Sequence, residues 1–134
     1  MTTFYVAVIS AGLSQPSSTR LLADRLARAV EAAPGEPTST RSLSGFVAAL
    51  AAADGPPAAA IVDLTARAYD GLAAIDAARD AGVRVLAVGQ HDDHVLRKAA
   101  LAAGAERVLA YQKLFADGPA TIAAFLAAPA HAPA

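Results

Sequence analysis

Cysteine and tryptophan are both absent from this 134-residue chain. Without cysteine the chain can form no disulfide, no thiol-based catalytic site and no cysteine-ligated zinc site. Aromatic residues make up only 5% of the sequence, although hydrophobic residues make up 55%, and much of that fraction is alanine. We therefore expect one core of ordinary size, built from Leu, Val, Ile and Ala.

An excess of charge of either sign is also missing. Eleven Lys and Arg residues oppose twelve Asp and Glu residues, so the net charge is −1, and this balance argues against nucleic acid and against an anionic membrane as partners. No stretch approaches the roughly 20 apolar residues of a membrane helix. The start, "MTTFYVAVISAG", lacks the basic region of a secretory signal. We expect a cytoplasmic protein.

Short apolar runs alternate with longer segments of helical periodicity. The predicted strands are Phe4–Ile9, Thr38–Leu43, Ala58–Val62 with Asp63 at its end, Val83–Val88 and Arg107–Tyr111. The predicted helices are Ser17–Val30, Gly45–Ala53 capped by Ser44, Asp70–Asp80, a helix from Asp92 or Asp93 to Gly104, and Pro119–Ala127.

Such repeated β/α units, with no hairpin signal between them, predict an α/β fold. We expect three layers around a doubly wound, five-stranded parallel sheet of order 2-1-3-4-5. Residues 1–127 form the single predicted domain, and residues 128–134 form a mobile tail. In this architecture ligands bind at the carboxyl ends of the strands, where the strand order reverses. The loops at that edge are therefore the candidate site.

The first of these loops, Ser10–Thr19, is rich in small hydroxyl residues and leads into a predicted helix. Unpaired N–H groups at a helix N-terminus favour an anion, and glycine lets the backbone approach it closely. The loop therefore suggests a phosphate site. A serine- and threonine-rich helix cap without a ligand is the alternative interpretation.

The stretch "VISAGLSQPSSTRLLADRLA" (Val8–Ala27) resembles the first strand, phosphate loop and first helix of actinobacterial NADPH-dependent FMN reductases, a flavodoxin-like family. The resemblance implies an FMN-binding protein, with the phosphate in this loop and the flavin ring near the later strand ends. "AYDGL" (Ala68–Leu72) matches the end of that family's ring-binding loop, whereas Asp63 replaces its proline–aromatic pair. The implied cofactor-binding residues are Ser10, Gly12, Ser14, Ser17, Ser18, Thr19, Arg20, Asp63, Tyr69 and Gly89.

The later part of the chain, Ala58–Phe115, instead resembles response-regulator receiver domains. The spacing in "DLTARAYDGL" places Asp63 at the position of the phosphoacceptor. Receivers also need an acidic pair after the first strand, a hydroxyl residue after the fourth and a lysine after the fifth. The acidic pair is replaced here by Ser10 and Ala11, and the hydroxyl residue by Gly89.

At the position of the receiver lysine stands Tyr111, with Lys113 two residues later, where a strand extension would keep it on the same face. A lone carboxylate holds Mg²⁺ poorly, so this resemblance implies a degenerate receiver that is not phosphorylated. Such a module would bind a protein partner, or form a homodimer, through the face made by strand 4, helix 4 and strand 5. A hybrid scaffold without a ligand is a further alternative.

"HDDH" (His91–His94) contains residue types that bind divalent metals. The competing interpretation is that an aspartate caps the next helix while both histidines are exposed. No third, distant ligand is evident, so no metal site is predicted. The leading hypothesis from sequence is an FMN-binding relative of the NAD(P)H-dependent FMN reductases, and the receiver-like module is the alternative.

Overall fold

The strands of this computed structural model form one parallel sheet in the order β2-β1-β3-β4-β5. The structure describes residues 4–9, 35–40, 42–51, 57, 59–64, 69–90 and 92–127. The strands are β1 (Phe4–Ile9), β2 (Gly35–Thr40), β3 (Ala59–Asp63), β4 (Arg84–Gly89) and β5 (Arg107–Ala110). The helices are α2 (Leu43–Leu50), α3 (Gly71–Asp80), α4 (His94–Ala103) and α5 (Tyr111–Ala127).

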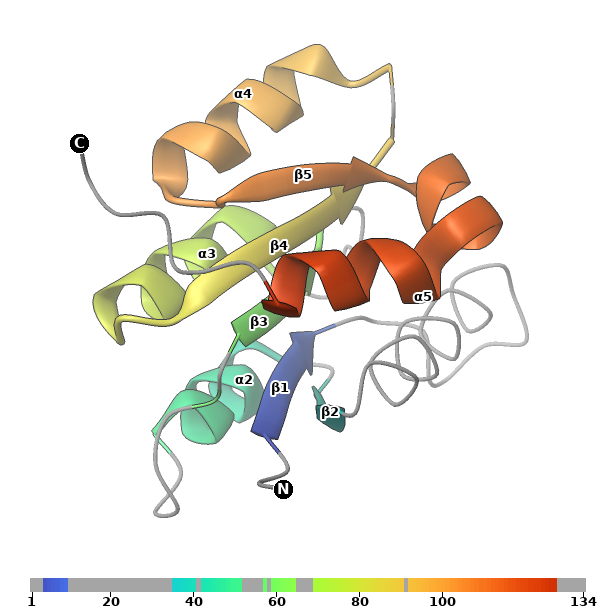
Figure 1. The fold of residues 1–134 in the computed structure, drawn as a ribbon. Coiled ribbons are helices and arrows are strands. Elements are labelled where there is room, and N and C mark those ends of the chain that lie inside the picture. The colour runs from blue at the N-terminus through green and yellow to red at the C-terminus, as the bar shows by residue number, and fades with distance from the viewer. Residues whose placement is uncertain are drawn as a thin grey trace, which may run out of the picture.

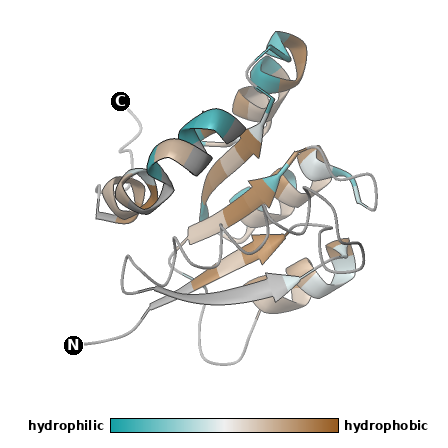
Figure 2. Cartoon of the chain, turned by 90° about the vertical axis from the view of Figure 1, so that its right-hand side faces the viewer, coloured by the Kyte–Doolittle hydropathy of each residue, from teal (hydrophilic) through white to brown (hydrophobic). Residues whose placement is uncertain are grey.

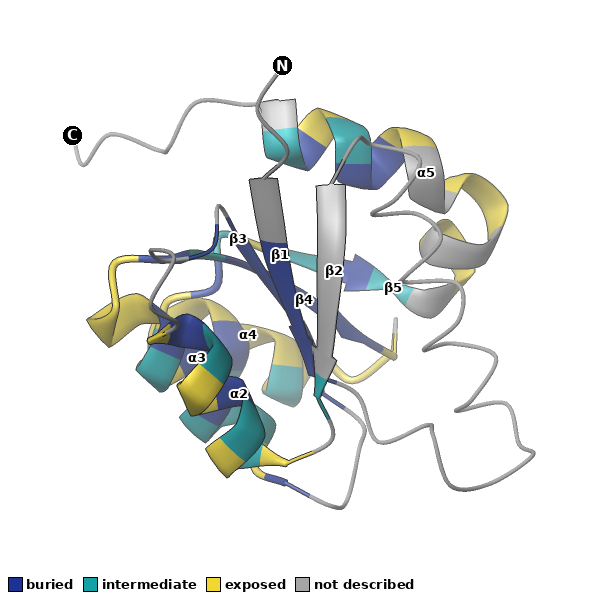
Figure 3. Ribbon diagram, turned by 90° about the horizontal axis from the view of Figure 1, so that it is seen from below, coloured by how far each residue is buried: buried dark blue, intermediate teal, exposed yellow. Residues whose placement is uncertain are grey.

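Helices cover both faces of the sheet. In Figures 1 and 3, α2, α3 and α4 lie on one face and α5 lies on the other. The side chains of the strands divide accordingly: Ile9 and Val62 pack with α2 and α3, whereas Val8, Ile61 and Leu86 pack with α5. The predicted α/β class and parallel sheet are confirmed.

The two central strands are buried on both sides. All residues of β3 and the last five of β4 are buried, and the middle of the sheet is strongly hydrophobic in Figure 2. A strand between two helical layers must present apolar side chains in both directions. The apolar runs that predicted these strands follow from this burial.

The second strand begins earlier than the sequence predicts. It runs from Gly35 to Thr40 rather than from Thr38 to Leu43, and Pro37 stands opposite Val6 of β1. Proline normally interrupts a strand, but an edge strand pairs on one side only, so it tolerates a residue without an N–H on its outer side.

Helix α2 is displaced in the same direction. Ser42, not Ser44, is its N-cap, and its hydroxyl accepts a hydrogen bond from the Gly45 N–H at 3.1 Å. The helix ends at Leu50, before the predicted Ala53. Two serines separated by one residue give the same capping signal, so the sequence did not distinguish them.

The fifth strand ends at Ala110, and α5 follows at once from Tyr111. The sequence predicted a loop here and a helix only from Pro119. The backbone of Asp117 is not helical (φ −152°, ψ 32°), which divides α5 into two segments. Proline is tolerated in the first turn of a helix, so Pro119 marked only the second segment.

Two other predictions concern residues outside the described part of the chain, and a third concerns membrane helices. The predicted helix Ser17–Val30 and the predicted tail, residues 128–134, lie outside the described residues. Within the described part of the chain, no helix has the length and apolar character needed to cross a membrane.

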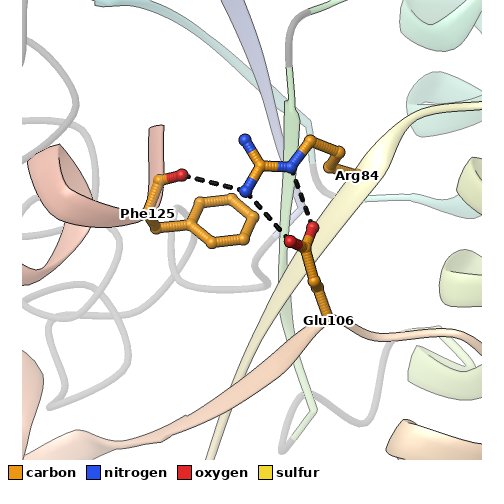
Figure 4. A network of polar contacts seen from close by, with 3 residues as sticks. All are labelled: Arg84, Glu106 and Phe125. Carbon is orange, nitrogen blue, oxygen red and sulfur yellow. Dashed lines mark hydrogen bonds and ion pairs between the residues drawn. The ribbon is translucent and has the colours of Figure 1, made fainter. Parts of the chain in front are cut away.

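Arg84 joins three elements at the amino end of β4 (Figure 4). Its Nε donates to Glu106 Oε2 at 2.8 Å and its terminal nitrogen Nη2 to Glu106 Oε1 at 3.1 Å, so the pair is bidentate. Nη2 also donates to the Phe125 carbonyl oxygen at 3.0 Å, and the guanidinium lies 4.5 Å from the centre of the Phe125 ring. A cation near the C-terminal carbonyls of a helix complements its dipole. Arg84 therefore fixes β4, the start of β5 and α5 together.

Glu106→Gln should lower the free energy of unfolding by roughly 1.5–3 kcal/mol, because it removes a charge-assisted bidentate pair whose side chains are only 16% and 21% exposed. Asp76→Asn is the matched control. Its ion pair with Arg79 is about half exposed, so its loss should cost less than about 0.5 kcal/mol. Urea unfolding followed by far-UV circular dichroism measures both changes. Equal losses would contradict the role given to Arg84.

Gly104→Ala should destabilise the chain by at least about 1 kcal/mol. Gly104 ends α4 with φ 125°, and an added Cβ would lie 2.8 Å from Arg79 Cδ. Adding Arg79→Ala should restore only the part of the lost stability that is due to this contact, since the backbone strain at residue 104 remains. Thermal unfolding separates the two parts, and full recovery in the double variant would exclude backbone strain as a cause.

Candidate functional site

The carboxyl ends of β1, β3 and β4 bring together the described candidate residues. Asp63 ends β3 opposite Val88, and Gly89 ends β4. Tyr69 lies just before α3 and is 9% exposed. The other candidates lie outside the described residues: Ser10, Gly12, Ser14, Ser17, Ser18, Thr19 and Arg20.

The hydroxyl group of Tyr69 bridges two strands. It contacts the carbonyl oxygen of Ile9 at 2.9 Å and that of Asp63 at 2.5 Å, so its single proton serves both acceptors. These carbonyls end β1 and β3. A buried tyrosine hydroxyl requires such partners, and here it links the two strands between which the strand order reverses.

Leu64 covers the neighbouring part of the edge. Its backbone N–H donates to the Val88 carbonyl at 2.8 Å, which extends the pairing of β3 with β4. Its side chain lies between two glycines: a Cβ on Gly71 would lie 3.2 Å from Leu64 Cδ2, and one on Gly89 would lie 3.4 Å from Leu64 Cδ1. The absence of a side chain at Gly71 therefore lets the start of α3 approach the end of β3 closely.

Asp63 is completely buried, with 0% of its surface exposed. None of the described buried side-chain oxygen or nitrogen atoms lacks a hydrogen-bond partner. The carboxylate is thus part of the packed interior at the end of β3, beside Leu64 and the backbone held by Tyr69.

Lys113 does not extend β5, and the expectation that it keeps the face of that strand is wrong. It belongs to α5, where its ammonium lies 3.6 Å from Asp117 Oδ2, and both side chains are about half exposed. The reason is that the chain turns directly from β5 into a helix at Tyr111, so the period-two argument for a strand no longer applies.

The acidic residues that precede α3 and α4 act as helix caps. Asp70 Oδ1 accepts hydrogen bonds from the N–H groups of Leu72 and Ala73 at 3.0 and 3.2 Å. Asp93 Oδ1 accepts from the Leu96 N–H at 3.0 Å, as one interpretation of "HDDH" expected. Among the described residues, which exclude His91, no three His, Asp or Glu side chains are placed to hold a metal ion.

The sequence did not reveal two residues that shape this edge. Leu64 occurs there only within the receiver-like stretch, and the FMN reductase resemblance gives Tyr69 a place beside the flavin without a hydrogen-bonding role. A signal was present for Tyr69, because a tyrosine near a buried strand end must bury its hydroxyl with acceptors.

Tyr69→Phe should lower the free energy of unfolding by about 1–3 kcal/mol, because it leaves the buried carbonyls of Ile9 and Asp63 without their donor. Tyr69→Leu should cost more, since it removes the ring as well. Chemical denaturation measures both losses. A Phe variant as stable as the parent would show that the bridge contributes nothing.

No protein-family model matches the sequence, and no curated protein matches it either. Solved structures do match. A response regulator receiver domain protein (CheY-like) from Methanospirillum hungatei JF-1 superposes with a TM-score of 0.72 and 13% identity, covering 93% of this chain and 94% of that one.

Two further structures agree over similar lengths. A two-component response regulator of the LuxR family from Aurantimonas sp. SI85-9A1 has a TM-score of 0.71 and 20% identity, covering 94% of this chain and 86% of that one. A protein from Chloroflexus aurantiacus J-10-fl, named as a response regulator, has a TM-score of 0.72 and 18% identity, covering 95% of this chain and all of that one. The resemblance to FMN reductases finds no support here. The chain has the fold of a response-regulator receiver domain. This fold is consistent with the flavodoxin-like fold that the sequence predicts.

Proposed function

We propose that the chain is a receiver-like module that binds a protein partner and does not use phosphorylation of Asp63. The observation that carries the proposal is the separation of the two groups that would have to cooperate. Asp63 is fully buried, whereas Lys113 is held outward on α5 by Asp117. A phosphoryl group on Asp63 would lack access, and Lys113, paired with Asp117, would not be placed to neutralise it.

The remaining positions support the same conclusion. Gly89 provides no hydroxyl group, and Leu64 packs against it. The acidic pair is replaced in the sequence by Ser10 and Ala11. Mg²⁺ needs several oxygen ligands in near-octahedral geometry, and a single buried carboxylate does not supply them.

The proposed partner face is the outward side of α4 with β5 beside it; β4, which the sequence also assigned to this face, is buried. Helix α4 carries two large apolar side chains that are exposed, Val95 at 82% and Leu101 at 45%. Exposed apolar residues that lie together on a surface are typical of protein contacts. Homodimerisation through this face is an alternative within the same proposal.

FMN binding stays a prediction from the sequence, because its phosphate loop lies outside the described residues. At the ring end of that proposed site, Tyr69 is engaged with backbone carbonyls and Asp63 is buried. Quenching of FMN fluorescence at micromolar protein, abolished by Ser17→Glu with Thr19→Glu, would favour the flavoprotein interpretation over the receiver-like one.

Acetyl phosphate with Mg²⁺ should leave the chain unmodified. Intact-mass spectrometry should show no phosphoryl adduct on the parent, and none on Asp63→Asn. A receiver domain of known phosphorylation, treated in the same tube, controls for the reagent. An adduct that disappears in Asp63→Asn would overturn the proposal.

A further inference from the structure

The outward side of α4 is a continuous exposed surface. Ala100 is buried in the core, and Leu96 and Ala103 are partly buried against it. Val95, Lys98, Leu101 and Ala102 are all exposed, and their spacing of three, six and seven residues places them side by side on the helix. Figure 3 shows much of α4 as exposed. We call these four residues the α4 surface.

Unpaired positive charge borders the α4 surface. Within the described chain no ion pair joins Arg97 or Lys98 to an acid, and both are exposed. Arg107 of β5 does not belong to this surface, because it pairs with Leu86 and so lies on the face of the sheet that α5 covers.

The nearby acids are largely committed elsewhere. Glu106 is bound to Arg84, and the Asp93 carboxylate caps the helix. Inside α4 itself there is no acidic residue, and Asp92, just before it, lies at the end away from Leu101. The middle and end of the α4 surface therefore combine apolar contact area with cations that no acid of the described residues pairs with.

We propose that the partner of this module is an acidic amphipathic helix, which packs apolar side chains on Val95 and Leu101 and places carboxylates beside Lys98 and Arg97. This inference rests on the proposed partner-binding function. A helix suits the surface because ridges of side chains three and four residues apart fit between those of another helix. Opposite charges at the rim would then set orientation and speed the encounter.

A second copy of the chain fits this surface less well. Two-fold contacts bring the same patch of both copies together. Lys98 and Arg97 of one copy would then lie opposite Lys98 and Arg97 of the other. Like charges placed across an interface are unfavourable. The charge of the α4 surface thus selects a different, acidic partner.

A display library of helical peptides with randomised surface positions, selected on the immobilised full chain, tests the proposal. Selected peptides should be rich in Asp and Glu beside apolar residues at helical spacing. Leu101→Asp should weaken the best peptide at least about tenfold, and Lys98→Glu should also weaken it and reduce its dependence on salt.

Val47→Asp is the matched control. Val47 is 43% exposed on α2, close to the 45% of Leu101, so it tests for general effects of a new surface carboxylate. It should leave peptide affinity within about twofold. Amide NMR shifts caused by the peptide should centre on residues 94–103.

Four outcomes would overturn the inference. The library could yield basic or uncharged peptides, or the NMR shifts could centre away from α4. The chain could also bind phosphatidylserine vesicles, or associate with itself in a concentration-dependent way, with Leu101→Asp abolishing that binding or association. None of these outcomes implies that Asp63 is phosphorylated. Each would therefore reject the acidic helix as the partner but not the proposal of an unphosphorylated partner-binding module. A phosphoryl adduct on Asp63 would instead reject the proposed function.

Discussion

The parallel sheet must be apolar on both faces, and the other features of this chain follow from that constraint. Helices α2 to α4 cover one face and α5 covers the other, so β3 and β4 leave almost no polar side chain in the middle of the molecule. Polar chemistry is confined to the strand ends. Asp63 fits this pattern: it is the one buried carboxylate among the residues whose burial is described, and it is the last residue of β3.

At the edge where ligands bind in folds of this kind, the chain uses its own groups to close the described part of the site. Tyr69 serves the backbone carbonyls of β1 and β3, and Leu64 lies between Gly71 and Gly89. A site of reactive groups needs access and charges that converge on one point. Here the acid is enclosed and the lysine points elsewhere, while the accessible apolar and basic side chains gather on α4. This distribution of side chains is the physical basis of the proposed partner binding.

The sequence predicted the strands well wherever burial imposed an unbroken apolar run. The bounds of β1 were predicted as they are found, and those of β3 and β4 differ by one residue or so. It was less informative where the rules admit exceptions, as at Pro37 in an edge strand and at the two candidate caps Ser42 and Ser44. The helical start of α5 was missed because nothing local marks Tyr111 as a boundary. Tertiary contacts such as Arg84 with Glu106 have no periodic signature, since residues 22 positions apart meet only in the fold.

The clamp formed by Arg84 has a mechanical consequence. Strand β5 is only four residues long and pairs on one side, so by itself it would be a weak anchor. Glu106, which immediately precedes β5, is coupled through a single guanidinium to the last turns of α5. A displacement of β5 would therefore have to break or carry with it the contacts of Arg84 with α5, so the two elements are held at this end of the sheet by one shared side chain.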